Sequence, residues 1–291
     1  MQASNEFVTS GEYERELRVA IELARLAGAA TLQFYGGPLV VEHKGESDEP
    51  VTQADRVANE LIVGGLHVAF SDDGILAEES TDTERRLSRA RVWMVDPLDG
   101  TKGFIAGSGD FAVQIGLAVE GESVLGVVHQ PVADVLHWAA RGHGAWVARP
   151  EIGSEPLRVS GENDLTRMRL AASRSHRSGR MDRVLHALGI TEEVRRNSVG
   201  VKIGLIVERQ CDLYIHLSLG TKQWDTCAPE AIVREAGGTM TDLWGVPLRY
   251  NSPDVMNRNG LVASNGIAHQ SIINHLSPLL TEFGRTRIET E

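Results

Sequence analysis

Residues 93 to 104 read WMVDPLDGTKGF, and the six residues Asp96-Pro97-Leu98-Asp99-Gly100-Thr101 are the most informative part of this stretch. The apolar run before them, Val92 to Val95, is typical of a buried strand, and Pro97 is expected to end that strand directly after Asp96. Because proline fixes its own φ and restricts the residue before it, the turn is stiff. We therefore expect it to hold the Asp96 and Asp99 carboxylates on one side.

The same turn offers ligands for a cation and for an anion. Two fixed carboxylates suit a hard divalent cation. Gly100 allows the backbone to approach a ligand closely, and Thr101 stands where a helix is expected to begin with unpaired N–H groups. Metal-assisted phosphate chemistry requires this combination. The alternative is a tight turn in which the aspartates only accept hydrogen bonds from the backbone.

Length and composition place few limits on the function. With 291 residues, the chain can form one large domain or two of ordinary size. Hydrophobic residues make up 42% and charged residues 24%, as in soluble globular proteins. The sequence shows neither an apolar run of about 20 residues nor the apolar region of a signal peptide near its start. We therefore expect a cytoplasmic protein that has no membrane partner.

Charge and cysteine content argue against two classes of protein. A formal net charge of −11 disfavours a nucleic-acid polymer as partner, because a duplex requires a basic surface. A small phosphorylated metabolite remains possible, since bound cations can reverse the local charge of a site. Cys211 and Cys227 lack the spacing of a zinc site, so we expect them to be reduced and structural.

The first half of the chain predicts two helices followed by strands. Apolar and small residues at helical spacing predict a helix over 12–35, which ends at the Gly-Gly-Pro sequence 36–38. A short strand over 39–42 and an exposed loop over 45–50 precede a second helix, 53–68, whose start from Thr52 to Asp55 fits a capping box. Runs of β-forming residues over 111–147, broken by three turn sequences, predict an antiparallel meander.

After residue 150 the pattern changes to an alternation of strands and helices, which indicates an α/β layer. We expect strands over 169–172, 212–217, 239–242 and 260–263, and helices over 181–188, 201–209 and 226–236, with a last helix ending near 283. The change of pattern places a domain boundary near residue 150. Residues 1–150 would form an α+β metal-binding domain, and 151–291 an α/β domain that completes the metal and substrate site.

Two further carboxylates are candidate metal ligands. Glu78 and Glu79 end a short strand, where adjacent side chains point to opposite faces, so one can face a metal ion. The alternative is that both are solvated. Asp225 follows the bulky Trp224 at the expected N-cap of a helix, and a capping carboxylate keeps lone pairs for a cation. The alternative here is a cap alone.

Candidate anion ligands lie in the second half of the chain. The sequence Ser173-Arg174-Ser175-His176 follows a strand end and offers hydroxyls, a guanidinium and an imidazole. It can equally be an ordinary polar loop. Ser198 precedes a helix and could touch a ligand, and Lys202 stands near the start of that helix, where a lone lysine is usually solvated.

Together these segments resemble the inositol monophosphatase superfamily of metal-dependent, lithium-sensitive phosphatases over nearly the whole chain. The resemblance rests on three motifs in the family's order: Ala-Glu-Glu-Ser at 77–80, Asp-Pro-Leu-Asp-Gly-Thr at 96–101, and Trp-Asp at 224–225 with Ala-Gly-Gly at 236–238. Lys102-Gly103-Phe104 is more similar to the 3′(2′),5′-bisphosphate nucleotidase branch, including its bacterial CysQ type, than to the inositol phosphatases, which tend to have Thr-Asn-Phe. Ala77 departs from the family, where glycine is usual.

The resemblance implies a fold and a metal site. The fold is a layered αβαβα sandwich of the α+β or α/β class, with an N-terminal antiparallel sheet and helices and a C-terminal mixed α/β sheet. Two or three Mg²⁺ ions would be bound by Glu78, Asp96, Asp99, Asp225 and the carbonyl of Leu98. Oxygen ligands without Cys or clustered His agree with Mg²⁺ rather than zinc.

The resemblance also implies catalytic and substrate-binding residues. Glu78 and the Thr101 hydroxyl, oriented by Asp55, would take the proton of a metal-bound water. The amides of Gly100 and Thr101 would hold phosphate oxygens. A second phosphate would meet Lys102 and Arg174, and the substrate site would include His176, Ser198 and Lys202.

We therefore expect an Mg²⁺-dependent phosphomonoesterase that removes the 3′-phosphate of adenosine 3′,5′-bisphosphate and also acts on 3′-phosphoadenosine 5′-phosphosulfate. Within the phosphatases, the alternatives are inositol monophosphate and a sugar or amino-alcohol phosphate. From a different class, the alternative is a regulator that binds phosphorylated metabolites without turnover. The family resemblance allows a monomer or a homodimer.

Overall fold

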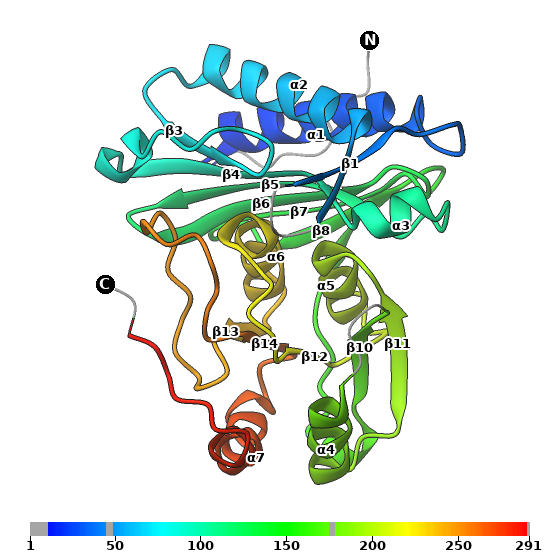
Figure 1. Cartoon of the computed structure of the whole chain (residues 1–291), viewed down its shortest axis with the longest axis vertical. Coiled ribbons are helices and arrows are strands. Elements are labelled where there is room, and N and C mark those ends of the chain that lie inside the picture. Colours follow the sequence, from blue (N-terminus) through cyan, green and yellow to red (C-terminus); the bar gives the residue numbers. More distant parts are fainter. Residues whose placement is uncertain (1–10, 45–48, 175–177, 290–291) are drawn as a thin grey trace.

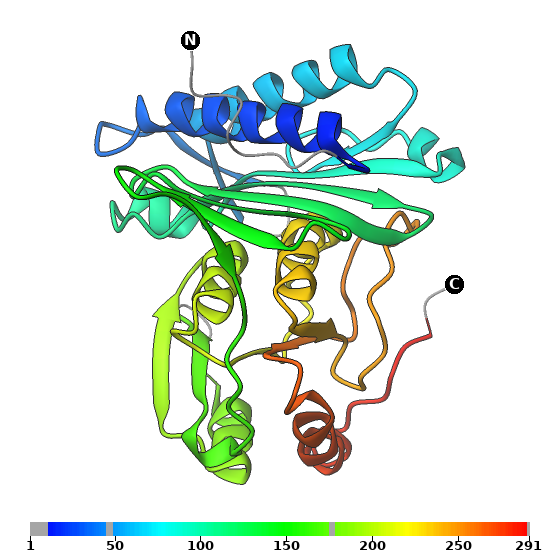
Figure 2. The ribbon, with the colours of Figure 1, turned by 180° about the vertical axis from the view of Figure 1, so that it is seen from behind.

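The computed structural model describes residues 11–44, 49–174 and 178–289. Two helices, a seven-stranded sheet, two further helices, a five-stranded sheet and two last helices are stacked in this order (Figures 1 and 2). The predicted αβαβα sandwich is therefore confirmed. In the described part of the chain, no helix is both long and apolar enough to cross a membrane.

Helices α1 (Glu14–Leu32) and α2 (Gln53–Ala69) cover the outer face of the larger sheet (Figure 1). Both are amphipathic, and their apolar faces join Trp93 and Trp138 of the sheet in one core. The predicted capping box of α2 is present, because Asp55 Oδ2 accepts a hydrogen bond from Thr52 N at 2.8 Å. A two-stranded sheet, β1 (Val41–Lys44) with β2 (Glu49–Thr52), precedes α2.

The larger sheet contains the predicted meander. Its strands follow chain order and are β3 (Gly74–Ala77), β4 (Arg91–Asp99), β5 (Ala112–Val119), β6 (Glu122–Gln130), β7 (Val135–Ala140), β8 (Ala145–Arg149) and β9 (Gly153–Leu157). The strands β3 and β4 are parallel, and each later pair is antiparallel. A short helix, α3 (Thr101–Ile105), follows β4 directly.

Helices α5 (Val199–Val207) and α6 (Gln223–Glu235) lie between the two sheets (Figure 2). Two glycines allow α6 to approach the larger sheet closely. A Cβ at Gly116 would stand 2.8 Å from Ala228 N, and one at Gly126 would stand 2.2 Å from Ala228 O. The N-terminal end of α6, with Asp225, is thereby held close to the strands β4 and β5.

The smaller sheet has the strand order β11-β10-β12-β14-β13 and is mixed, as predicted. Its strands are β10 (Arg169–Ser173), β11 (Glu192–Arg196), β12 (Leu213–His216), β13 (Thr239–Thr241) and β14 (Leu261–Ser264). Helices α4 (Gly179–Leu188) and α7 (His269–Glu282) cover its outer face.

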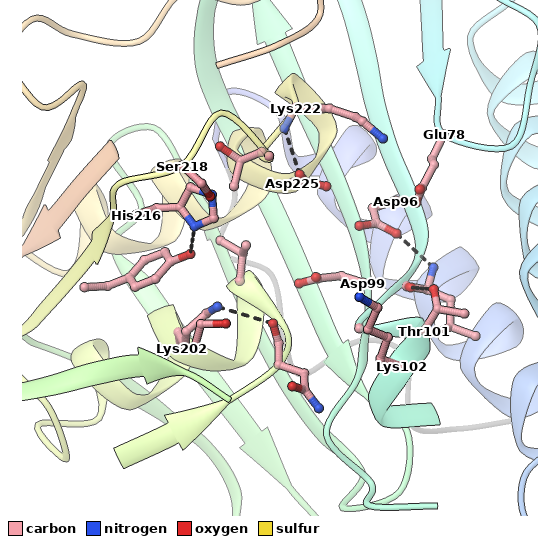
Figure 3. Close-up of a pocket in the computed structure, with 18 of the residues that line it drawn as sticks. Glu78, Asp96, Asp99, Thr101, Lys102, Lys202, His216, Ser218, Lys222 and Asp225 are labelled. Carbon is pink, nitrogen blue, oxygen red and sulfur yellow. Dashed lines mark hydrogen bonds between the residues drawn. The ribbon is translucent and has the colours of Figure 1, made fainter. Parts of the chain in front are cut away.

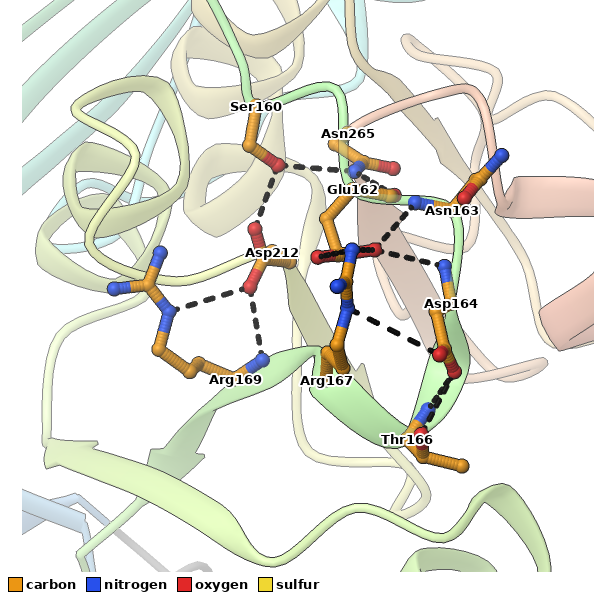
Figure 4. A network of polar contacts seen from close by, with 9 residues as sticks. All are labelled: Ser160, Glu162, Asn163, Asp164, Thr166, Arg167, Arg169, Asp212 and Asn265. Atoms are coloured by element: carbon orange, nitrogen blue, oxygen red, sulfur yellow. Dashed lines mark hydrogen bonds and ion pairs between the residues drawn. The ribbon is translucent and has the colours of Figure 1, made fainter.

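A polar network fixes the segment 158–168, which runs from the larger sheet to the smaller one (Figure 4). Its centre is Asp212, which is buried and accepts hydrogen bonds from Ser160 Oγ at 2.6 Å and from Arg169 N at 2.8 Å. Asn265 Nδ2 donates to Ser160 Oγ at 3.0 Å. Strand β9 extends the larger sheet to Leu157, and a division into two domains near residue 150 stays a prediction.

Two expectations about elements were wrong. Strand β4 does not end at Asp96 but continues to Asp99 through an irregular segment. The predicted loop 45–50 overlaps the start of β2, and its residues 45–48 lie outside the described residues. The sequence analysis also missed two edge strands, β9 and β11.

Candidate active site

A cavity of about 350 Å³ opens where β3, β4 and α3 face the N-terminal ends of α5 and α6 (Figure 3). Four predicted metal ligands, Glu78, Asp96, Asp99 and Asp225, line it together with Leu98. The Asp96, Asp99 and Asp225 carboxylates point toward a common space. Residues that are far apart in the sequence are thus brought together.

The turn between Asp96 and Asp99 is a bulge in β4. Asp96 pairs with Gln114 and Asp99 with Ala112, with a register shift between the two pairs. A bulge tolerates Pro97, because a residue that is unpaired in the ladder does not need an N–H group. Asp96 Oδ1 accepts a hydrogen bond from Leu98 N at 3.0 Å, which holds the carboxylate against the turn.

Donors from the start of α5 and from β5 hold the Asp99 carboxylate in place. Its Oδ2 atom accepts hydrogen bonds from Ser198 Oγ at 2.5 Å, from Gly200 N at 2.9 Å and from Gln114 Nε2. All three use one oxygen, which leaves the lone pairs of Oδ1 for a cation. The Ser198 side chain is fully buried and does not line the cavity, so the contribution of Ser198 passes through Asp99.

Asp225 is the third residue of α6 and not its N-cap, which is Lys222. The expectation that Asp225 is the N-cap was therefore wrong by three residues. Instead, Asp225 Oδ2 accepts a hydrogen bond from Lys222 N at 2.7 Å, as in a capping box. Glu78 directly follows β3, and its backbone N donates to Val95 O at 3.0 Å. This pairing of β3 with β4 brings Glu78 beside Asp96.

The clustered carboxylates of the cavity favour the binding of a cation. Burial raises the pKa of Asp96 well above its usual value, and the negative charges of Glu78, Asp99 and Asp225 raise it further. Burial raises the pKa of Asp99 to about 6, although its hydrogen bonds and Lys202 act in the opposite direction. Burial and the charges of Asp99 and Glu78 also raise the pKa of Asp225 well above its usual value. Close-set carboxylates of this kind are stabilised in their charged form by bound cations.

The arrangement does not form a closed metal cage. Among the described residues, no group of three or more His, Cys, Asp or Glu lies in a position to hold one ion. Mg²⁺ usually keeps several waters and takes only one or two carboxylates together with phosphate oxygens. The donor set, which consists of carboxylate oxygens and the Leu98 carbonyl, fits such open sites.

The predicted hydrogen bond between Thr101 and Asp55 is present. Thr101 Oγ1 lies 3.3 Å from Asp55 Oδ1 and also 3.3 Å from the Leu98 carbonyl oxygen. The other Asp55 oxygen accepts from Thr52 N and Thr52 Oγ1, at 2.8 and 2.6 Å. Burial raises the pKa of Asp55, and these hydrogen bonds from Thr52 act against that rise. Asp55 thus connects the start of α2 to the start of α3.

Gly100 must be a glycine for two reasons. Its φ is +100°, in the left-handed region, and a Cβ at this position would stand 2.8 Å from the Asp110 carbonyl oxygen. The turn therefore packs closely on the segment before β5. This packing sets the Gly100 and Thr101 amides at the first turn of α3, on the wall of the cavity.

Three lysines bring positive charge to the cavity. Lys102 lines it from α3, Lys202 from α5 and Lys222 from the N-cap of α6. Lys202 is only 2% exposed, and its Nζ donates to Asn197 O at 3.3 Å and lies 4.5 Å from the Tyr214 ring centroid. Burial lowers the pKa of Lys202 to about 8, although nearby aspartates act to raise it.

Besides Ser198, two predicted substrate residues are not placed at the cavity. Arg174 is exposed, and its Nε lies 3.8 Å from Asp110 Oδ2 instead of lining the cavity. His176 lies outside the described residues. The substrate-binding roles of both residues stay predictions.

The sequence analysis missed a set of lining residues from β12 and the segment after it. These include Tyr214, His216, Ser218, Thr221 and Lys222. Tyr214 OH lies 3.1 Å from His216 Nδ1, and His216 Nε2 lies 2.7 Å from Ser218 Oγ. A polar, glycine-containing segment between a strand end and the Trp-Asp motif was the available signal, because such loops often carry binding residues.

The layered fold and an acidic cavity that is also lined by three lysines are those of a metal-dependent phosphatase. Residues 12–280 match the model of the inositol monophosphatase family. The chain belongs to this family.

Three relatives illustrate this similarity. The 3′(2′),5′-bisphosphate nucleotidase CysQ of Salmonella typhimurium is 38% identical over 239 residues, which cover 80% of this chain and 93% of that protein. The histidinol-phosphatase of Chlorobaculum parvum is 31% identical, with 89% of this chain and 95% of that protein covered. The crystal structure of CysQ from Bacteroides thetaiotaomicron superposes with a TM-score of 0.75 at 31% identity, covering 87% of this chain and 98% of that one.

Proposed function

We propose that this protein is a metal-dependent 3′(2′),5′-bisphosphate nucleotidase that removes the 3′-phosphate of adenosine 3′,5′-bisphosphate. The observation that carries the proposal is a single cavity in which buried aspartates stand beside Lys102 and Lys202. A substrate with two phosphates can place one at the acidic, metal-binding side and the other near the lysines. The similarity to two CysQ proteins supports this choice.

The residues present fit two or three Mg²⁺ ions. Asp96 and Asp99 are buried and Asp225 is half-buried. Burial and neighbouring carboxylates raise the pKa values of all three, and each keeps lone pairs for a cation. Together with Glu78 and the Leu98 carbonyl, they would hold the ions. Bound Mg²⁺ would lower the pKa of a water molecule and offset negative charge on the phosphate and the leaving oxygen.

The chain's own groups then position and deprotonate the water. Thr101 Oγ–H donates to Asp55 Oδ1, so the lone pairs of Thr101 Oγ1 are available to accept from the water. The Glu78 carboxylate accepts the proton. The water oxygen attacks phosphorus, the bond from phosphorus to the ester oxygen breaks, and that oxygen leaves with the bonding electrons and takes a proton from a solvent water. The Gly100 and Thr101 amides hold phosphate oxygens meanwhile.

A second candidate substrate is an amino-alcohol phosphate, because the histidinol-phosphatase relative aligns over most of both chains. Phosphate release should be measured from adenosine 3′,5′-bisphosphate, 3′-phosphoadenosine 5′-phosphosulfate, inositol 1-phosphate and histidinol phosphate. We expect the highest kcat/KM for adenosine 3′,5′-bisphosphate. A higher value for the inositol or histidinol ester would replace the proposed substrate with that ester.

The same assay tests whether the protein turns over at all. We expect phosphate release to require Mg²⁺ and to be suppressed by Li⁺ at millimolar concentration. Tight binding of the nucleotide without release at saturating Mg²⁺ would instead favour a phosphometabolite-binding regulator. A cytoplasmic location and a monomeric or homodimeric state remain part of the proposal.

A further inference from the structure

Three residues outside the predicted site form a chain of hydrogen bonds at the cavity wall (Figure 3). Tyr214 OH lies 3.1 Å from His216 Nδ1, and His216 Nε2 lies 2.7 Å from Ser218 Oγ. Tyr214 is fully buried, His216 is half-buried and Ser218 is exposed. These hydrogen bonds therefore connect the core of the smaller sheet to the cavity surface.

The donors and acceptors of these three side chains fix the direction of their hydrogen bonds. A buried phenol must donate its proton, and His216 Nδ1 is the acceptor that the described structure provides for it. A neutral imidazole whose Nδ1 accepts carries its proton on Nε2, so Nε2–H donates to Ser218 Oγ. The Ser218 hydroxyl proton is then directed away from His216. Burial raises the pKa of Tyr214, which keeps the phenol protonated.

The position of these three residues indicates which ligand they would contact. His216, Ser218 and Ser173 line both the acidic cavity and an adjoining cavity of about 280 Å³. The other residues that line this second cavity are mainly apolar and also include Ser178 and Glu193. A substrate held by the acidic side must pass these residues to enter the second cavity. The Tyr214 ring also lies against the Lys202 ammonium, 4.5 Å from its centroid.

We propose that Tyr214 and His216 are positioning residues that present the Ser218 hydroxyl as a hydrogen-bond donor to the non-reacting phosphate of the substrate. The Tyr214 ring supports Lys202 at the same time, so one side chain aligns a neutral donor and a cation. This inference rests on the proposed function, because it requires a substrate with a second oxyanion.

The experiment compares two nucleotides that differ only in that oxyanion: adenosine 3′,5′-bisphosphate and adenosine 3′-phosphate. In Ser218→Ala and Tyr214→Phe, we expect KM for the bisphosphate to rise about tenfold, as for a lost hydrogen bond to a charged group. We expect kcat to stay within about twofold and KM for adenosine 3′-phosphate to be unchanged. Tyr214→Phe keeps the ring against Lys202 and so isolates the hydroxyl.

Controls separate this role from a structural one. Ser271→Ala on the exposed side of α7 and Tyr13→Phe before α1 should change neither KM. The ¹⁵N shifts of the His216 imidazole report which nitrogen carries the proton. We expect protonated Nε2 in the unmodified protein and a mixture of tautomers in Tyr214→Phe.

The outcomes are distinct. The proposed role of Tyr214, His216 and Ser218 would be wrong, and the proposed function unaffected, in any of three cases. These are equal changes in KM for both nucleotides, no change for either nucleotide, or a proton on Nδ1 of His216. If the unmodified protein hydrolyses neither nucleotide but acts on another ester, the proposed function is wrong and the assigned ligand of Ser218 is wrong with it.

Discussion

Asp96 is a buried carboxylate whose nearest charged neighbours are also carboxylates. Without a bound cation, the ionised Asp96 destabilises the folded protein, because burial and repulsion both disfavour the charged form. Burial also raises the pKa values of Asp99 and Asp225, and donors from α5 and from the Lys222 backbone offset this in part. This balance leads to opposite effects of one substitution on activity and on stability.

In Asp96→Asn we expect kcat for phosphate release at saturating Mg²⁺ to fall by about 100-fold or more, since one anionic ligand is lost. We expect the free energy of unfolding in EDTA to rise, because one buried charge is removed. Steady-state kinetics and urea unfolding measure the two effects. Asp72→Asn, in an exposed turn, is the control. A kcat equal to that of the parent would show that Asp96 is not a metal ligand.

Thr101 offers a second test, since its hydroxyl alone is expected to matter. Thr101→Val keeps the shape but removes the group that Asp55 orients, and we expect kcat to fall by about 100-fold with little change in KM. Thr101→Ser retains the hydroxyl and should keep most of the activity. Similar losses in both variants would assign Thr101 a packing role instead.

At the scale of the element, α6 places Asp225 because two glycines of the larger sheet let the helix approach closely. The same helix carries Glu230, which is buried, accepts a hydrogen bond from Tyr250 OH and lies 3.6 Å from Arg234. Burial raises the pKa of Glu230 to about 7. The folded protein thus keeps a proton on Glu230 at pH values where the unfolded chain has lost it.

The sign of the resulting pH dependence follows from linkage. The stability that this raised pKa contributes is fully present below the unfolded value, near pH 4.5, and is lost as the pH rises through about 7. Glu230→Gln stays neutral, so we expect it to gain stability relative to the parent between pH 5 and pH 8, on the order of 2 kcal/mol. Urea unfolding at both pH values measures this. Glu60→Gln, exposed on α2, should show no such gain, and a parallel response of the Glu230 variant and the parent would contradict the prediction.

At the scale of the whole molecule, the cavity lies between layers that belong to different sheets, so its geometry depends on how the sheets are joined. The network around Asp212 fixes the segment that runs between them (Figure 4). Arg169 and Ser160 both donate to this one buried carboxylate, and Asn265 binds Ser160 from β14's end. Loss of the carboxylate would leave buried donors without acceptors.

We therefore expect Asp212→Ala to lower the free energy of unfolding by about 2–3 kcal/mol, the cost of unsatisfied buried polar groups. Asp212→Asn keeps one acceptor oxygen and should lose less. Thermal and urea unfolding measure both variants, with Asp72→Ala as a surface control expected to stay within about 0.5 kcal/mol. If Asp212→Ala is as stable as the control, the network does not hold the segment.

Elements with a strong local pattern were predicted well. Helix α2 and the meander β5 to β8 follow from periodicity, a capping box and turn residues, all of which act between near neighbours in the chain. Edge strands lack that pattern. Strand β11 is rich in charged residues and β9 contains Pro156, and both are tolerated because an edge strand pairs on one side only.

By itself, the sequence determined the acidic turn at 96–101, the capping box from Thr52 to Asp55 and, through its motifs, the family to which the chain belongs. Only the tertiary structure decided that Ser198 lies behind Asp99, that Asp225 sits in the third position of α6, and that Tyr214 and His216 reach the cavity. The physical reason is that local motifs arise from neighbouring residues. The direction of a side chain at a site between two sheets depends on how distant layers pack.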